Sequence, residues 1–202
     1  MTVFETIKAR RSVRRFKDTP IPDEIINEML ETARHAPSGG NAQNYTFGIV
    51  KNERLKQQLA KAAGNQTWIA SAPVIIAGCG DISWDIKDPP EDDFGLIVNY
   101  LRFGKDFVNE MKKYPDRHAL MKLWHNGSPV IAMEHMFLTA VSHGLNACFI
   151  GYLDIDKASE ILGLPGNLAC LFLLPVGYAD EAPGEKTVKT VQEISFFDKW
   201  EL

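Results

Sequence analysis

Two apolar runs constrain the fold of this chain more than any other feature. Residues 73–79 and 168–178 are apolar at almost every position, and each run is short enough to form a single strand. Continuous apolar runs of this length are typical of strands that are covered on both faces of their sheet. We therefore expect a central sheet whose two faces are covered by other parts of the chain.

Amphipathic segments around the two runs can supply that cover as helices. Thr2–Glu5 has the capping-box pattern that opens a first helix, and Pro22 suits the first position of a second one. Residues 129–143 are apolar on nearly all sides, which indicates a helix that is central or at a subunit interface. The sequence thus predicts an α+β fold with a mixed sheet wrapped by helices, in one domain over residues 1–202. Further elements are expected as helices at 53–63, 94–113 and in the stretch that ends at Leu164, and as strands at 45–50 and 145–150.

Composition agrees with a single intracellular domain. The chain has 202 residues of which 45% are hydrophobic, and no apolar run approaches the roughly 20 residues that cross a membrane. The first residues lack the apolar core of a signal peptide, so we expect a cytoplasmic protein without a membrane partner. Cys79, Cys148 and Cys170 all lie in apolar strand-like runs, which favours buried, inert thiols over a disulfide framework.

Residues 10–16 read Arg-Arg-Ser-Val-Arg-Arg-Phe. On an extended segment Arg10, Ser12 and Arg14 share one face, and guanidinium groups bind phosphate oxygens through paired hydrogen bonds. Such a run can also be a solvated face or a nucleic-acid contact. The formal charge of −4 and the pI near 5.7 argue against a nucleic-acid partner. The contrast between a basic cluster and an acidic chain favours a small anionic ligand.

A loop at residues 36–44 follows the second helix and is rich in small and amide residues. The side chains of Ser38, Asn41 and Gln43 can each donate and accept hydrogen bonds, and the two glycines allow a close approach of the backbone to a ligand. The loop can be an ordinary connection. It also suits a flat heterocycle with alternating donors and acceptors.

Other chemistries lack their sequence patterns. Gly78-Cys79-Gly80 follows an expected strand, but Ser83 stands where a dinucleotide fingerprint needs a third glycine, so a nicotinamide would be a transient reductant. The five histidines form no His-x-x-x-His pair, and we expect no metal site. No nucleophile elbow occurs at residues 127–129.

Four patterns in order along the chain resemble the nitroreductase family of FMN-dependent oxidoreductases. They are RRSxRxF at residues 10–16, APSxxNxQ at 36–43, GLxxCxIGxxD at 144–154, and LGLP with LPxGY at 162–165 and 174–178. The resemblance runs from about residue 4 to about residue 194. It implies a nitroreductase-like fold with a mainly antiparallel sheet, in a homodimer whose subunits intertwine.

The resemblance also implies how FMN would be held. Arg10 and Ser12, with Arg11 between them, match residues at the phosphate and ribityl end, and Arg14 matches a basic residue beside the pyrimidine edge. Pro37, Ser38 and Asn41, with Gln43 in the same loop, match a segment that reaches the flavin from the opposite subunit. Ile150 and Gly151 match backbone beside flavin N5, and Asn65 resembles a flavin-contacting asparagine of some members. A further phosphate contact is expected from Lys186 or, second, from Lys189, because Val188 stands where a basic residue would align.

The implied activity is hydride transfer from NAD(P)H through flavin N5 to an electron-poor acceptor, such as a nitroaromatic or a quinone, in a ping-pong cycle with no catalytic side chain. The alternatives are a flavin-fragmenting or reductive dehalogenating member of the superfamily and a non-catalytic FMN-binding protein.

Residues 81–125 are the variable region of the family. There the acidic stretch 81–95, with Trp84, is either a surface loop or a substrate lid, and Trp124 and His125 fall in the same zone. The apolar tail at 196–200 is expected to cover its own core or to embrace a partner.

Overall fold

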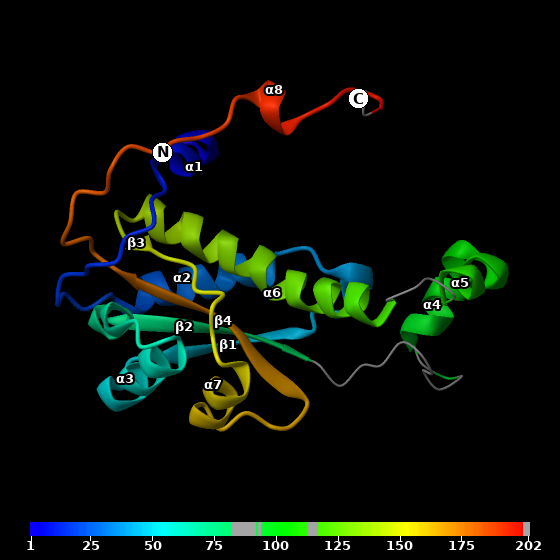
Figure 1. Ribbon diagram of the computed structural model, residues 1–202, viewed down its shortest axis with the longest axis horizontal. Helices are drawn as coiled ribbons and strands as arrows, with labels where there is room; N and C mark the ends of the chain where they lie inside the picture. The colour runs from blue at the N-terminus through cyan, green and yellow to red at the C-terminus, as the bar shows by residue number, and fades with distance from the viewer. Residues whose placement is uncertain (82–91, 93, 113–116, 200–202) are drawn as a thin grey trace.

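A four-stranded antiparallel sheet with the strand order β1-β2-β4-β3 lies at the centre of the molecule (Figure 1). The computed structural model describes residues 1–81, 92, 94–112 and 117–199. The two apolar runs form the two central strands, which pair from Val74 opposite Val176 to Asp81 opposite Leu168. The strands are β1 (Tyr45–Val50), β2 (Val74–Asp81), β3 (Asn146–Ala147) and β4 (Leu168–Gly177).

Side chains alternate between two cores, one on each face of the sheet. Val74 and Ile76 of β2 pack with helices α2 and α6, which lie against each other on one face. Ile75 and Ala77 point to the opposite face, where α3, the 3-10 helix η2 and α7 cover the sheet. Both faces are thus covered, as the apolar runs predicted. These helices are α2 (Asp23–Arg34), α3 (Glu53–Ala62), η2 (Thr67–Ser71), α6 (Arg117–Ser142) and α7 (Ile155–Ile161).

The remaining helices lie at the edges. The capping box predicted for the first helix is present: Thr2 and Glu5 exchange hydrogen bonds between side chain and backbone. Figure 1 shows α4 and α5 away from the sheet at one end, and the C-terminal segment with α8 extending away from the body. These elements are α1 (Val3–Ala9), η1 (Gly39–Asn41), α4 (Phe94–Phe103), α5 (Lys105–Lys112) and α8 (Val191–Ile194).

The predicted strand at 145–150 is only partly correct. β3 ends at Ala147, and Ile150 pairs again with Leu173 through an isolated bridge. Between them Pro175 of β4 faces Cys148; proline has no N–H to donate, so only the bond from the Cys148 N–H to the Pro175 carbonyl remains. The expected mixed sheet is antiparallel throughout its named strands, and the parallel element is a single bridge between Ser12 and Ala147.

Two predicted helix boundaries are also wrong. The helix expected at 94–113 is two helices, because Gly104 adopts a left-handed φ of 80° that ends α4. The helix expected to begin at Pro129 begins at Arg117 and runs through the proline. Its central position is confirmed, since Met133, Met136 and Phe137 are buried.

Several expectations fall on residues that lie outside the described ranges or whose side chains are not described. The proposed lid falls mainly on residues 82–91 and 93, which lie outside the described residues, as does Trp84. Trp124 and His125 are placed by backbone only, in α6. Within the described ranges, no helix is both long and apolar enough to cross a membrane.

A candidate anion-binding site

The N-terminal arginine segment is held against β3 and against the chain just after β4 by backbone hydrogen bonds. Val13 donates its N–H to the Ala147 carbonyl at 3.1 Å, and Lys17 donates to Tyr178 at 2.8 Å. The side chains of Val13 and Phe16 are buried and anchor the segment, whereas Ser12 and Arg14 are exposed. Ser12 and Arg14 therefore share one exposed face with buried Val13 between them, whereas Arg15 is exposed as well and ends the alternation.

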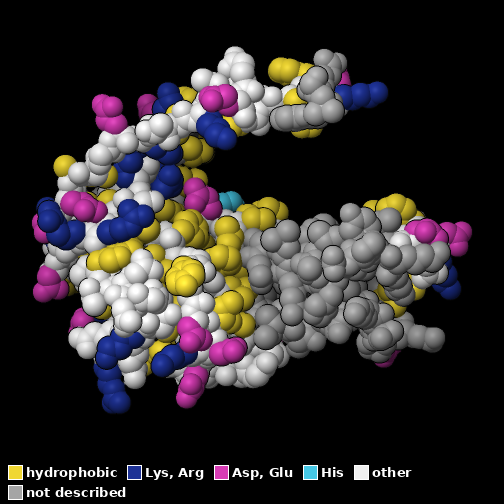
Figure 2. Space-filling model, viewed as in Figure 1, with side chains coloured by type: hydrophobic (Ala, Val, Ile, Leu, Met, Phe, Trp, Pro, Cys, Tyr) yellow, Lys and Arg dark blue, Asp and Glu magenta, His cyan; other side chains and the backbone are white. Residues whose placement is uncertain are grey.

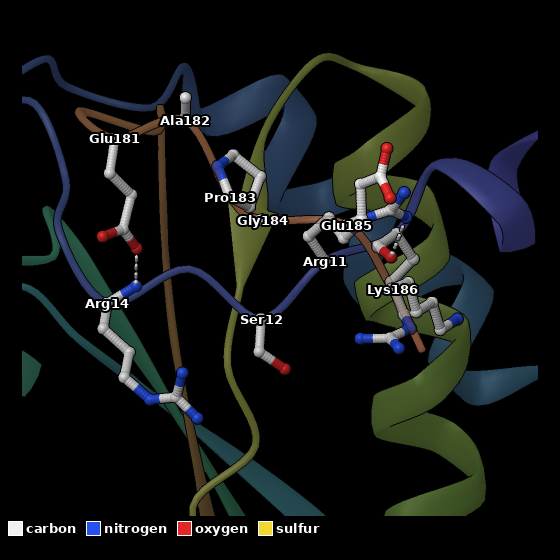
Figure 3. A pocket seen from close by; sticks show the side chains of 10 residues that line it. Arg11, Ser12, Arg14, Glu181, Ala182, Pro183, Gly184, Glu185 and Lys186 are labelled. Carbon is white, nitrogen blue, oxygen red and sulfur yellow. Dashed lines mark hydrogen bonds between the residues drawn. The ribbon is translucent and has the colours of Figure 1, made fainter. Parts of the chain in front are cut away.

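A pocket of about 360 Å³ lies between this segment and the chain that follows β4. In Figure 3 Arg14 and Glu181 stand at one side, Lys186 and Glu185 at the other, and the Ser12 hydroxyl between them. Four basic side chains and one hydroxyl thus face a common space. The lining residues are Arg10, Arg11, Ser12, Arg14, Glu181, Ala182, Pro183, Gly184, Glu185 and Lys186.

The electrostatics of the pocket involve α6 as well. The Arg10 guanidinium lies over the ring of Phe137, 5.3 Å from its centroid. Burial raises the pKa of the nearby Glu134 carboxyl, while the charges of Arg10, Lys186 and His135 act in the opposite direction. A carboxyl group that sequence reasoning did not identify therefore lies near Arg10 and Lys186, outside the residues that line the pocket.

Cys148 is buried and interacts with two residues that line the pocket, Ser12 and Arg14. Burial raises the pKa of its thiol, and the charge of Arg14 and a hydrogen bond with Ser12 oppose that shift. The free, buried state predicted for Cys79, Cys148 and Cys170 is confirmed. The described residues also contain no cluster that could hold a metal ion.

The structure distinguishes the two lysines offered as the second phosphate contact. Lys186 lines the pocket, whereas Lys189 is not among its lining residues. Arg10, Arg11, Ser12, Arg14 and Lys186 are the predicted site residues that one chain brings together.

Ile150, Gly151 and Asn65 are not among the residues that line the pocket, although Ile150 belongs to the core against which Trp68, the aromatic neighbour of Arg14, packs. Ile150 pairs with Leu173 of β4. Asn65 follows α3 in a left-handed conformation with φ of 58°, next to Gly64, where an added Cβ would lie 3.6 Å from Tyr152. A Cβ on Gly151 would meet only Phe172, at an ordinary 3.6 Å, so the chain itself does not require a glycine there.

The loop at 37–43 lies at the other end of the sheet. It precedes β1, whose first residue pairs with Gly80, which in turn lies opposite Ala169 at the start of β4. The arginine segment lies at the other end, where it bridges to Ala147, the β3 partner of Val176, and to Ala179 just beyond β4. β4 has ten residues and spans roughly 30 Å. One chain therefore does not bring Pro37, Ser38, Asn41 or Gln43 to the pocket.

Backbone strain nevertheless marks this loop. Asn41 and Gln43 have φ of 58° and 49°, a region that side-chain-bearing residues rarely adopt. The Gln43 N–H donates to the Ser38 hydroxyl at 3.0 Å and stabilises the turn. Strained residues cluster at ligand sites, and among the described residues only Asp198 joins Asn41, Gln43 and Asn65 as a non-glycine with positive φ.

Sequence reasoning missed Glu134, Glu181 and Trp68, whose ring centroid lies 5.9 Å from the Arg14 guanidinium carbon. Glu181 and the neighbouring Asp180 are acids that directly follow the last apolar run; complementary charge could have paired Asp180 with Arg15, whereas Glu181 accepts a hydrogen bond from the Arg14 backbone N–H. Glu134 and Trp68 reach the arginine segment only through tertiary packing, and no local pattern indicates them.

Comparisons with known proteins agree with the sequence resemblance. A sequence model described as the nitroreductase family matches residues 7–178. An NADH dehydrogenase of Thermus thermophilus is 28% identical over 180 residues, covering 85% of this chain and 84% of the relative. An iodotyrosine deiodinase of Hydra vulgaris is 41% identical over 189 residues, covering 87% of this chain and 64% of the relative. Among solved structures, the NADPH:FMN oxidoreductase from Vibrio harveyi complexed with NAD+ aligns with a TM-score of 0.77 and 25% identity, over 99% of this chain and 78% of that one.

Proposed function

Because the chain belongs to the nitroreductase family, and its relatives include NADPH-dependent FMN and flavin reductases, we propose that its cofactor is FMN. The cofactor would be held in the pocket between the arginine segment and residues 181–186. The observation that carries the proposal is the convergence of Arg10, Ser12, Arg14 and Lys186 on one pocket. FMN ends in a phosphate at one end and a flat ring at the other. A row of donors with basic groups at both ends fits that shape (Figure 3).

Each residue of the pocket would contact a different part of FMN, according to its position. Arg10, Arg11 and Lys186 supply charged donors for the phosphate, since hydrogen bonds to an anion are the strong ones. Ser12 supplies a hydroxyl between them and Arg14. Arg14 stands at the opposite side from Lys186 and supplies a fixed positive charge for the pyrimidine edge.

Bound flavin would accept a hydride from NAD(P)H and pass the electrons to an electron-poor acceptor. The chain contributes binding, orientation and electrostatics, and it needs no side chain as acid or base. NAD(P)H and the acceptor would use one place in turn, because the chain has no dinucleotide fingerprint for a separate nicotinamide site.

We further propose that the working unit is a homodimer in which the loop at 37–43 of one chain completes the pocket of the other. Two observations support it: the loop and the pocket of one chain are at opposite ends of the sheet, and the C-terminal segment leaves its apolar side chains uncovered. Val191 is 68% exposed and Phe197 is 89% exposed. Figure 2 shows this segment extending over an open hollow beside the body, and a second subunit would bury it.

Reductive dehalogenation is the second candidate function. The Hydra vulgaris relative named iodotyrosine deiodinase is 41% identical to this chain, above the 28% of the relative named NADH dehydrogenase. Reductive dehalogenation would draw on the same source of electrons: a reduced flavin can supply two electrons, a proton takes the place of the halogen on the ring carbon, and the halogen leaves as halide. The two candidates therefore differ in the acceptor and share the pocket.

An acceptor panel tests the proposal. Purified protein reconstituted with FMN is given NADH or NADPH together with a nitroaromatic, a quinone or an iodinated tyrosine, and NAD(P)H oxidation and iodide release are followed. Parallel lines in double-reciprocal plots with a nitroaromatic or a quinone support the proposal. Iodide release with no turnover of the other acceptors supports the second candidate, and no turnover of any acceptor contradicts both.

A further inference from the structure

Arg14 has an aromatic neighbour that no part of the proposed site includes. Its guanidinium carbon lies 5.9 Å from the ring centroid of Trp68, within the range of a cation–π contact. Within the described part of the chain the Arg14 side chain forms no hydrogen bond or ion pair, and only its backbone N–H is bound, to Glu181. The guanidinium donors are therefore free to face a ligand, and the indole ring restrains the side chain that carries them.

Trp68 is itself fixed from several directions. It packs against Val13, Phe16 and Ala72 on one side, and against the core beneath α3 on the other. The end of its helix η2 is held by Lys56, whose buried ammonium donates to the Ala72 carbonyl at 2.7 Å and pairs with Glu53 at 2.7 Å. A buried lysine with both partners in place holds the backbone of η2 rigidly. The indole face is therefore a fixed platform.

We propose that Trp68 is a positioning residue that holds the Arg14 guanidinium against the pyrimidine edge of the flavin and thereby raises the flavin reduction potential. This inference rests on the proposed function of the pocket. The physical reason is that an exposed arginine samples many rotamers, so its average charge at one ligand atom is small unless a neighbour restrains it. The ring supplies that restraint without occupying any of the five donors, which an acidic partner would do.

The electrostatic consequence has a definite sign. A cation near the ring stabilises reduced flavin, which is anionic, more than oxidised flavin, which is neutral. Loss of the restraint should therefore weaken the affinity for reduced FMN more than the affinity for oxidised FMN. We expect the ratio of the two affinities to fall about threefold to tenfold, or about 15 to 30 mV in the two-electron midpoint potential.

The test measures the midpoint potential of bound FMN in the holoprotein for Trp68→Leu, Trp68→Phe, Arg14→Ala and the double variant Arg14→Ala/Trp68→Leu. Leucine keeps apolar packing on Val13 but has no ring, whereas phenylalanine keeps a ring. Phe4→Ala is the matched control, because it removes another cation–π pair, with Lys8 at 4.5 Å from the ring centroid, which lies outside the pocket. The dissociation constant of oxidised FMN is measured for each variant.

We expect Trp68→Leu to lower the midpoint potential of bound FMN and Trp68→Phe to leave it close to that of the unchanged protein. In the Arg14→Ala background, Trp68→Leu should lower the potential no further. A potential of Trp68→Leu equal to that of the unchanged protein, while Arg14→Ala lowers it, overturns the inference and leaves the proposed function standing. An equal shift in both backgrounds also overturns it, because Trp68 then acts independently of Arg14. A protein that binds no FMN contradicts the proposed function itself.

Discussion

The backbone N–H of Arg14 donates a hydrogen bond to the Glu181 carboxylate at 2.6 Å and so joins the N-terminal segment to the chain that follows the last strand. Next to it Asp180 donates its N–H to the Arg15 carbonyl at 2.9 Å, and the Arg15 side chain returns a bond to the Asp180 carbonyl at 2.7 Å. These contacts fix one wall of the pocket (Figure 3). The basic residues at 10–14 thereby face residues 181–186, a segment that also carries Lys186.

Replacement of the two lysines tests which of them binds the phosphate. We expect Lys186→Ala to weaken FMN binding by about 1.5 to 3 kcal/mol, the range for a hydrogen bond to a charged group, and Arg10→Ala to have a similar effect. Lys189→Ala is the matched control, since Lys189 lies outside the pocket. Fluorescence titration of the apoprotein with FMN measures the three dissociation constants. Equal losses of FMN affinity in the two lysine variants would contradict the assignment of Lys186 as the phosphate contact.

Glu134 should make stability depend on pH. Burial raises the pKa of this carboxyl, so the folded state holds the proton more tightly than the unfolded chain does. Its contribution is therefore present below the ordinary pKa of about 4.3 and is lost as the pH rises through the raised pKa. The free energy of unfolding of the unchanged apoprotein should fall relative to that of Glu134→Gln over this window. Urea unfolding at a series of pH values measures both, and a constant difference across the window would rule out the shift.

Gly177 should tolerate no larger residue. An added Cβ would lie 2.7 Å from the Pro73 ring and 3.0 Å from the Phe16 ring, and neither ring can move freely. We expect Gly177→Ala to lower the free energy of unfolding by about 1 to 3 kcal/mol. Gly48→Ala in β1 is the control, because its Cβ would meet Ala77 at an ordinary 3.5 Å and should change stability by about 0.5 kcal/mol or less. Urea unfolding measures the free energy of unfolding of both variants, and equal values for Gly177→Ala and Gly48→Ala would contradict the packing argument.

Mixed dimers test the shared site. Arg10→Ala damages the pocket and Asn41→Ala damages the loop, so each variant alone should be inactive if the two segments act together. Heterodimers made by co-expression with two affinity tags would contain one intact combination and should recover part of the activity. If heterodimers form and stay inactive, or if sedimentation shows a fully active monomer, the composite site is wrong.

Much of the fold could be predicted because its decisive signals are local. The apolar runs that become β2 and β4 indicated strands covered on both faces, and the Thr2 capping box gave the start of α1. The errors arose where tertiary packing overrides a local preference. α6 runs through Pro129, a residue that usually begins or breaks a helix, and β3 is short because Pro175 on its partner cannot donate a hydrogen bond.

The candidate site likewise contains residues that the local sequence indicates and residues that only tertiary packing brings in. The arginine segment was predictable because its basic residues are adjacent in the sequence. Lys186 was expected only from the family resemblance, and no pattern of its own segment indicates it. Trp68 and Glu134 could not be found in this way, since each comes to the arginine segment from a different helix. Residues that tune a binding group from the side leave little trace in a single sequence.

Anaerobic reduction of the holoprotein tests the central claim most directly. The protein is reconstituted with FMN, freed of excess flavin and titrated with NADH or NADPH in the absence of oxygen, while the visible absorption of the flavin is recorded. The account predicts that about one equivalent of reduced nicotinamide per bound FMN bleaches the flavin, and that a nitroaromatic or a quinone then restores its colour. A protein that binds no FMN, or a bound flavin that stays oxidised with both nicotinamides, would contradict the account.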